Sequence, residues 1–298
     1  MAKMHIAYWK LTENPFQNVA DTRFAYLGNQ YHEAMARLLF LIEQQKTGGI
    51  LTGPFGVGKS MVLELVRDRL TKTGVADFVQ IDAAAGASVF IGRMLLRKLG
   101  YNPAEAELPQ IIETLAEHFS RPQPDEQHLV LAVDEAHLIL TPEAAEFLHL
   151  LANLTRRDSE GRTVSSAMTM ILSGHPELLQ KMAVDGALCQ RLQVRWEIKP
   201  LNEDQTREYI FSRIKVAGGG IDIFDPSVFS ILYQASGGLP RLINNICDIA
   251  LLLAAAARVP KVPGDIMDEA VYEADATNVL DLTIKGQKDF SGQVGRLS

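Results

Sequence analysis

A glycine-rich segment between an apolar run and an amphipathic stretch carries the clearest chemical signal in the sequence. It fits the pattern G-x-x-x-x-G-K-[ST] with the residues Gly53, Pro54, Phe55, Gly56, Val57, Gly58, Lys59 and Ser60. Glycines let the backbone curl so that successive N–H groups point at phosphate oxygens, and the positive N-terminal end of the following helix faces the same oxygens. We expect Lys59 to face the β- and γ-phosphates and the Ser60 hydroxyl to bind Mg²⁺. Together with Met61, the segment predicts a site for ATP; a glycine-rich turn that binds nothing is the alternative.

A pair of carboxylates follows an apolar run about 75 residues further on. Residues 129–133 are apolar throughout, as in a strand buried on both faces, and Asp134 and Glu135 come directly after them. Asp134 is expected to hold the water shell of Mg²⁺, while Glu135 polarises the attacking water as a general base. Two solvated acids at a strand end are the alternative. With the glycine-rich segment, the pair predicts magnesium-dependent ATP hydrolysis.

Residues 134–137 also spell DEAH, the signature of a helicase superfamily. Such helicases need two tandem α/β motor domains, and only one fits before Pro200. His137 is therefore expected to begin a helix beside the site rather than to act as a helicase element.

Short β-branched runs that alternate with segments of helical period must position these residues. The expected strands are residues 49–52, 77–82, 129–134, 168–173 and 192–198, and the helical patterns between them are 59–72, 87–99, 108–119, 142–158 and 176–183. This alternation is typical of an α/β fold with a parallel five-stranded sheet and helices on both faces. After Leu201 only helical patterns follow, at 203–217, 226–235, 240–258 and 265–275. The change near Pro200 predicts a second, small all-helical domain.

Composition and charge narrow the class of protein. The chain has 298 residues, 47% of them hydrophobic, and a formal net charge of −7, which argues against coating nucleic acid through bulk charge. Its two cysteines, Cys189 and Cys247, are expected to be reduced thiols. The longest apolar run, residues 249–257, is well short of the roughly 20 residues that span a bilayer, and the first 14 residues lack the apolar stretch of a signal peptide. We therefore expect a cytoplasmic protein without direct membrane insertion.

The run at residues 168–173 ends in Ser173, a small polar residue beside the expected position of the γ-phosphate. Ser173 could orient the attacking water. A turn-forming serine before Gly174 is an equal alternative.

Taken in order, the motifs resemble those of the AAA+ ATPases, and within them the family of general secretion pathway protein A (ExeA type) and the pilus biogenesis ATPase MshM. The resemblance covers residues 11–274 and rests on the glycine-rich segment and on residues 11–16, 21–27, 133–137, 172–178, 190–192 and 237–241. It implies a P-loop base domain at 26–200 and a helical lid at 201–276 with ATP between them. A segment at 1–25 would lie near the nucleotide, where Pro15 and Phe16 pack by the adenine or in a core, and 277–298 would be a loosely ordered tail.

The resemblance also implies roles for single residues. Ser173 takes the sensor 1 position, Arg241 is sensor 2 and contacts the nucleotide, and Arg191 is an arginine finger offered to a neighbouring subunit. An ordinary surface ion pair is the alternative for Arg191 and for Arg195. A finger in trans implies a homo-oligomer, a ring or filament expected to be hexameric. The family's activity implies a motor or assembly ATPase whose protein partner belongs to a secretion or pilus-like envelope machine.

Departures from the family pattern leave other functions open. His175 stands where glutamine is common, residues 156–167 form a longer stretch than usual, and the membrane span and peptidoglycan-binding module of many members are absent from this sequence. A soluble partner would then supply any link to the membrane. A DNA-associated transposition ATPase of the TniB or TnsC type is the alternative, with phosphate contacts from Arg156, Arg157 and Arg162 or a solvated charged loop at the same place. A nucleotide-dependent scaffold without turnover is the third reading, which the presence of Glu135 disfavours.

Overall fold

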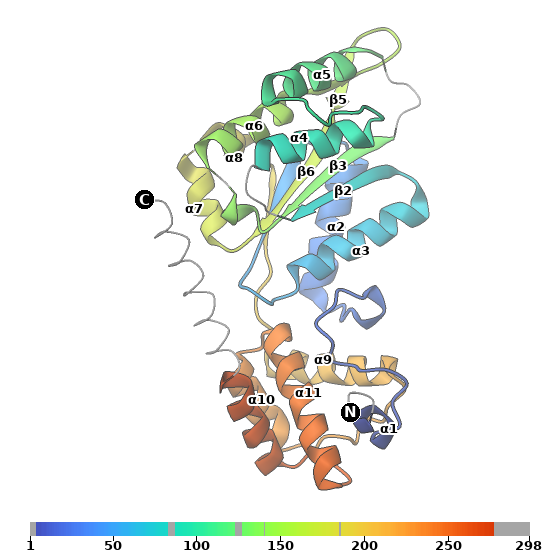
Figure 1. Cartoon of the computed structure of the whole chain (residues 1–298), viewed down its shortest axis with the longest axis vertical. Coiled ribbons are helices and arrows are strands. Elements are labelled where there is room, and N and C mark those ends of the chain that lie inside the picture. The colour runs from blue at the N-terminus through green and yellow to red at the C-terminus, as the bar shows by residue number, and fades with distance from the viewer. Residues whose placement is uncertain (1–3, 83–86, 123–126, 140, 185, 277–298) are drawn as a thin grey trace. The chain divides into compact units, whose positions relative to one another are not determined.

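The computed structural model describes residues 4–82, 87–122, 127–139, 141–184 and 186–276 (Figure 1). These residues divide into two compact units. One spans Leu27–Lys199, and the other combines the described residues 4–26 with 200–276. The expected tail at 277–298 lies outside the described residues.

The α/β unit is built on a parallel five-stranded sheet. Its strands are β1 (Gly48–Thr52), β2 (Ala76–Asp82), β3 (His128–Asp134), β6 (Met168–Gly174) and β7 (Val194–Glu197), in the order β2-β3-β6-β1-β7. Every pairing in this sheet is parallel. The three inner strands are buried along their whole length, which explains why their sequences are apolar without alternation. The predicted fold class is confirmed.

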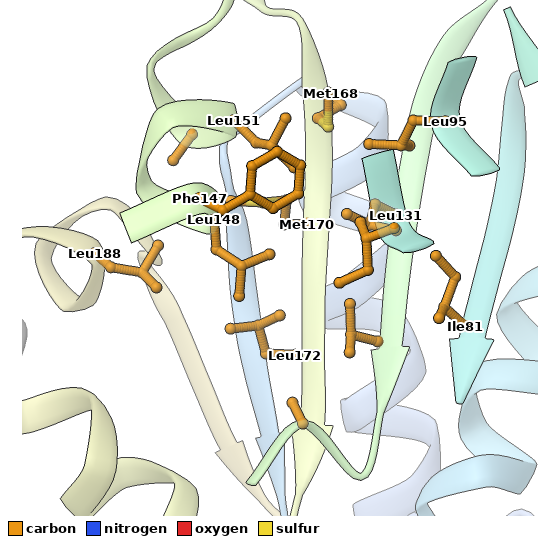
Figure 2. Close-up of a cluster of buried hydrophobic side chains, with 14 of the residues drawn as sticks. Ile81, Leu95, Leu131, Phe147, Leu148, Leu151, Met168, Met170, Leu172 and Leu188 are labelled. Atoms are coloured by element: carbon orange, nitrogen blue, oxygen red, sulfur yellow. The ribbon is translucent and has the colours of Figure 1, made fainter. Parts of the chain in front are cut away.

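Helices cover both faces of the sheet. On one face lie α2 (Asn29–Glu43) and α3 (Lys59–Thr73); on the other lie α4 (Ala87–Lys98), α5 (Leu108–Ser120) and α6 (Pro142–Asn153) (Figure 1). The core under the second face joins side chains from sheet and helices (Figure 2), among them Ile81, Leu95, Leu131, Phe147, Leu148, Leu151, Met170, Leu172 and Leu188. Because this packing fixes β3 and β6 against each other, it also fixes the polar residues at their carboxyl ends.

Helix α2 was absent from the sequence prediction. It buries Tyr31, Ala34, Leu38, Leu41 and Ile42. This i, i+3, i+7 spacing is the apolar stripe of an amphipathic helix, so the signal was present in the sequence.

The predicted helix at 142–158 was wrong beyond Asn153. The chain there forms a hairpin in which β4 (Thr155–Arg157) pairs antiparallel with β5 (Thr163–Ser166). Its turn is set by Asp158, whose Oδ1 accepts hydrogen bonds from the backbone N–H groups of Glu160 and Arg162, and by Gly161 at φ 76°. The turn formed by Asp158 and Gly161 therefore replaces the helix that the sequence pattern predicted here.

The second half of the α/β unit differs in smaller ways. The helical pattern at 176–183 becomes α7 (Glu177–Val184), followed by α8 (Gly186–Arg191), and the predicted strand at 192–198 shortens to β7. One 3₁₀ turn, η2 (Ala136–Leu138), lies in this unit, whereas another, η1 (Thr22–Phe24), lies in the N-terminal segment of the helical unit.

The helical unit contains α1 (Met4–Tyr8), α9 (Glu203–Val216), α10 (Val228–Ser236), α11 (Pro240–Ala257) and a helix over 264–276. The buried guanidinium of Arg213 on α9 ties the N-terminal segment to it by donating to the carbonyls of Pro15 and Gln17. Phe16 is buried in this unit, edge-on to Phe224, so it is a core residue there.

Among the described residues one helix, α11, is long and apolar enough by length and composition to cross a membrane. In the structure it packs against α1 and α10 and buries residues such as Ile243, Cys247 and Leu251. Its apolar character is therefore used in the core of the helical unit.

Candidate nucleotide-binding site

The glycine-rich segment forms a loop between β1 and α3, at the carboxyl edge of the sheet. Gly56 and Gly58 adopt φ values of 76° and 106°, a region that side chains rarely enter. At Gly53 a Cβ would lie 2.6 Å from the carbonyl oxygen of Ile198, the residue after β7, so this close approach also requires glycine. Helix α3 begins at Lys59 of this loop, and the first N–H groups of a helix have no partner within it and can bind an anion. This loop has the form of a phosphate cradle.

Lys59 is buried and folds back over the loop. Its Nζ donates to the carbonyl oxygens of Gly53 at 3.0 Å and Pro54 at 3.2 Å. Burial lowers the pKa of the Lys59 ammonium, and the carboxylates of Glu135 and Asp134 partly offset this effect. The two carboxylates thus help to keep Lys59 protonated, and its positive charge is what binding of a phosphate group would require.

Ser60 and Asp134, the two expected magnesium ligands, meet directly. The Ser60 hydroxyl donates to Asp134 Oδ2 at 2.6 Å, although 74 positions separate the two residues. Asp134 Oδ1 accepts the backbone N–H of Glu135 at 3.0 Å. Within the described ranges no group of three or more His, Cys, Asp or Glu could hold a metal. A hydroxyl and one carboxylate with phosphate oxygens and water fit the oxygen ligands of Mg²⁺ in nucleotide sites.

Glu135 and Ser173 each bring an unused polar atom to this edge. Because Val133 is paired with Leu172 in the sheet, the chain positions of Asp134 and Ser173 are neighbours where β3 and β6 end. Glu135 Oε2 and Ser173 Oγ are buried and have no hydrogen-bond partner among the described residues. Ser173 lies within β6 rather than in a turn. Glu135 Oε2 can therefore accept a hydrogen bond from a water molecule, and the Ser173 hydroxyl can bond a water molecule or donate to a phosphate oxygen.

A ring cluster that the sequence did not indicate lies beside Glu135. Phe55 of the loop stacks on the His175 ring at a centroid distance of 5.2 Å and meets His137 edge-on at 5.5 Å. His137 is buried, and its Nδ1 lies 3.4 Å from Glu135 Oε2. The three rings come from segments that are far apart in the sequence, so no local sequence pattern predicts the cluster.

Tyr31 on α2 is a second residue that the sequence analysis missed. Its hydroxyl donates to the Val57 carbonyl oxygen at 2.8 Å, in a buried position. A Cβ on Gly58 would lie 3.2 Å from Tyr31 Cε1, so the loop and the ring are in close contact. Recognition of α2 from its apolar stripe would have pointed to this side chain.

Three predicted residues, Met61, Arg191 and Arg241, take no part in the contacts described so far. Met61 follows Ser60 on α3 with a partly exposed side chain. Arg191 ends α8, is exposed, and has no ion pair within the described part of the chain, whereas Arg195 donates to the carbonyl oxygen and Sγ of Cys189. Arg241 is exposed near the start of α11 in the helical unit. The nucleotide roles of Arg191 and Arg241 stay predictions.

Comparisons with known proteins bear on the family and the fold. Residues 42–182 match the AAA domain family. General secretion pathway protein A of Aeromonas hydrophila is 29% identical over 273 residues, which is 91% of this chain and 48% of that protein. The chain therefore spans about half the length of this relative.

Solved structures with the same fold share little sequence. ORC of Drosophila, solved bound to DNA, matches with a TM-score of 0.66 and 16% identity over 90% of this chain and 65% of its own. Cdc6p from Pyrobaculum aerophilum matches with a TM-score of 0.65 and 15% identity over 86% and 71%. Domain III of the replication initiation protein DnaA from Thermotoga maritima gives a TM-score of 0.55 and 12% identity over 87% and 98%.

These likenesses establish the fold, and the match to the secretion protein adds sequence similarity across both units. The resemblance inferred from the motifs is thereby confirmed: the chain has the P-loop fold of the AAA+ type, its residues 42–182 match the AAA domain family, and the chain is similar to general secretion pathway protein A.

Proposed function

We propose that the chain is a magnesium-dependent ATPase that works as a cytoplasmic homo-oligomer and assembles or remodels a protein partner of a secretion or pilus-like envelope machine. The observation that carries the hydrolytic part is the direct contact between Ser60 and Asp134, beside Glu135 Oε2 and Ser173 Oγ, which have no hydrogen-bond partner in the described part of the chain. The envelope partner is inferred from the name of the relative in Aeromonas hydrophila, to which this chain is similar over about half of that protein's length.

The division of labour follows from the residue types. The loop N–H groups and Lys59 bind the phosphates, and Ser60 with Asp134 would hold Mg²⁺, which neutralises charge on the phosphate oxygens when bound. Glu135 polarises the attacking water by accepting its proton, and the Ser173 hydroxyl orients that water. Arg191 would complete the ATP site of a neighbouring copy of the chain. The copies would form a ring or a filament, and we propose a hexameric assembly.

Two substitutions test the hydrolytic assignment. Lys59→Ala removes the charge that binds the phosphates and should abolish nucleotide binding. Glu135→Gln keeps the shape of the side chain but removes its basicity, so this variant should bind MgATP and fail to turn it over. Binding is measured with a fluorescent ATP analogue and turnover by phosphate release; wild-type turnover by Glu135→Gln would remove Glu135 as the base.

A DNA-associated ATPase is the second candidate, because the β4–β5 hairpin carries Arg156, Arg157 and Arg162. Contacts already engage these arginines: Arg162, for example, pairs with Asp158 and Glu160, and Arg157 donates to the Gly161 carbonyl oxygen. We therefore expect weak DNA binding at physiological salt. The test is binding of labelled duplex DNA at about 150 mM salt, where the Debye length is about 8 Å. Submicromolar affinity that is lost when these arginines are neutralised would favour the DNA candidate.

A further inference from the structure

The backbone at Glu135 adopts an unusual conformation for a residue with a side chain. Its φ of 50° and ψ of 35° lie in the left-handed region, and the chain turns there from β3 into the 3₁₀ turn η2. Such a conformation persists only where the surrounding structure holds it in place. The contacts that hold η2 therefore decide where the Glu135 carboxylate lies.

His137 supplies a side-chain contact that fixes η2 to the end of β6. Its Nδ1 accepts the backbone N–H of His175 at 3.3 Å. Gly174 makes this approach possible, because a Cβ there would lie 3.0 Å from His137 Nδ1. Lys181 of α7 donates to the His137 carbonyl oxygen and adds a second tie to the same turn.

The hydrogen bond from His175 assigns the protonation state of the ring. A ring nitrogen that accepts an N–H carries no proton, so His137 is neutral with its proton on Nε2. Burial lowers the pKa of His137, and the neighbouring His175 and Lys181 add to this effect, while Glu135 and Glu177 oppose it. Because Nδ1 carries no proton, it cannot donate to Glu135 Oε2, which lies 3.4 Å away. The carboxylate therefore keeps its capacity to accept a proton from water.

We propose that His137 is a positioning residue for Glu135: its neutral ring clamps η2 to the carboxyl end of β6 and leaves the adjacent carboxylate unpaired. This inference rests on the proposed ATPase function and extends it, because it names the group that keeps the base in place and free. Protonation of the ring would break the bond from His175 and direct an N–H at Glu135, which would remove the base from use.

Two substitutions at His137 distinguish the effect of its hydrogen-bond acceptor from the effect of its side-chain volume. Asparagine can place an acceptor oxygen near the position of Nδ1, whereas leucine fills similar space without one. We expect His137→Leu to lower kcat by about tenfold to a hundredfold with nearly unchanged MgATP affinity, since displacement of a reacting group by about 1 Å has effects of this size. His137→Asn should retain most of the activity. His149→Asn, on α6, is the matched control.

The dependence of kcat on pH distinguishes the proposed role from a purely structural one, because a purely structural role of His137 would not change this dependence. Wild-type kcat should fall on the acid side as His137 becomes protonated, with a midpoint below the ordinary histidine pKa of 6.5. In His137→Asn the part of this acid limb that is due to His137 should disappear. Equal activity of His137→Leu and wild type, or equal damage from Leu and Asn in folded proteins, would overturn the proposal.

Nitrogen-15 NMR of the histidine rings tests the inference without ATPase activity. The His137 signal, identified by its loss in His137→Asn, should be that of the Nε2–H tautomer, and Glu135→Gln should lower its pKa because a neighbouring negative charge is removed. An Nδ1–H tautomer would refute the clamp. If wild-type protein hydrolysed no ATP, the proposed function would fail, while this measurement would still decide the geometry.

Discussion

Replacement of Tyr31 by phenylalanine should weaken nucleotide binding, although Tyr31 is not part of the phosphate-binding motif. The substitution removes one oxygen, which donates a buried 2.8 Å hydrogen bond to the Val57 carbonyl. The ring itself remains and still packs at Gly58, so no cavity of consequence is created. The effect of the hydroxyl on the loop is thereby isolated.

The size of the effect follows from the burial of the bond. A typical intramolecular hydrogen bond contributes about 1 kcal/mol to stability, and a buried acceptor left without a partner costs about 1–3 kcal/mol. If about 1 kcal/mol of this loss falls on the phosphate-binding arrangement of the loop, MgATP affinity decreases about fivefold. Because the hydroxyl bonds to the loop backbone and not to Glu135 or Ser173, kcat at saturating ATP should be nearly unchanged.

The assay is a titration of MgATP with steady-state phosphate release, accompanied by thermal unfolding. The midpoint temperature should fall by about 2–4 °C for each kcal/mol lost in a unit of this size. Tyr8→Phe is the matched control: it also removes a hydroxyl that donates to a carbonyl, that of Val259 at 3.0 Å, but at an exposed position in the helical unit. Unchanged MgATP affinity in a folded Tyr31→Phe protein would refute the support assigned to Tyr31.

Three further predictions concern the metal, the oligomer and pH. Ser60→Ala removes a hydroxyl from the expected magnesium site, so the Mg²⁺ concentration for half-maximal ATPase should rise severalfold in a metal titration while the free energy of unfolding changes little; an unaltered requirement would contradict the assignment. Specific activity should increase with protein concentration, and a mixture of inactive Lys59→Ala and Arg191→Ala proteins should regain activity; a flat profile without recovery would exclude a finger in trans. Burial, assisted by a nearby arginine, lowers the pKa of His128 to about 4 from 6.5, so the unfolded chain binds the proton first as pH falls. Stability should therefore decrease by up to about 3 kcal/mol between pH 6.5 and pH 4, and urea unfolding of His128→Asn should lack this loss.

The parts of the fold that sequence predicted are those in which a local pattern has one strong physical cause. The run that ends at Asp134 is apolar because β3 is buried on both faces, and Gly56 and Gly58 are required by positive φ. The same reasoning failed at residues 154–158, where a helical period continued into a hairpin. A turn held by Asp158 outweighed that weak signal, and pairing with β5 stabilised the alternative.

Contacts within the site were less predictable than its motifs because they join residues far apart in the chain. The sequence predicted Ser60 and Asp134 as magnesium-binding residues, and in the structure a hydrogen bond joins their side chains. It contained no comparable rule for Tyr31 and Val57, because a tyrosine on a helix carries no signature for a loop 26 positions away. Motifs report groups that contact a ligand, whereas groups that support those motifs depend on tertiary packing.

Gly174 illustrates how the structure changes the meaning of a residue. In the sequence it suggested a turn after Ser173, yet it is the last residue of β6 and its φ is not positive. Its missing side chain instead makes room for His137, 37 positions earlier, whose ring would meet a Cβ at 3.0 Å. A larger residue at this position would push η2 away from β6 and carry Glu135 with it. The glycine is therefore explained by the position of Glu135, the proposed base, a relation that the parallel pairing of β3 and β6 creates.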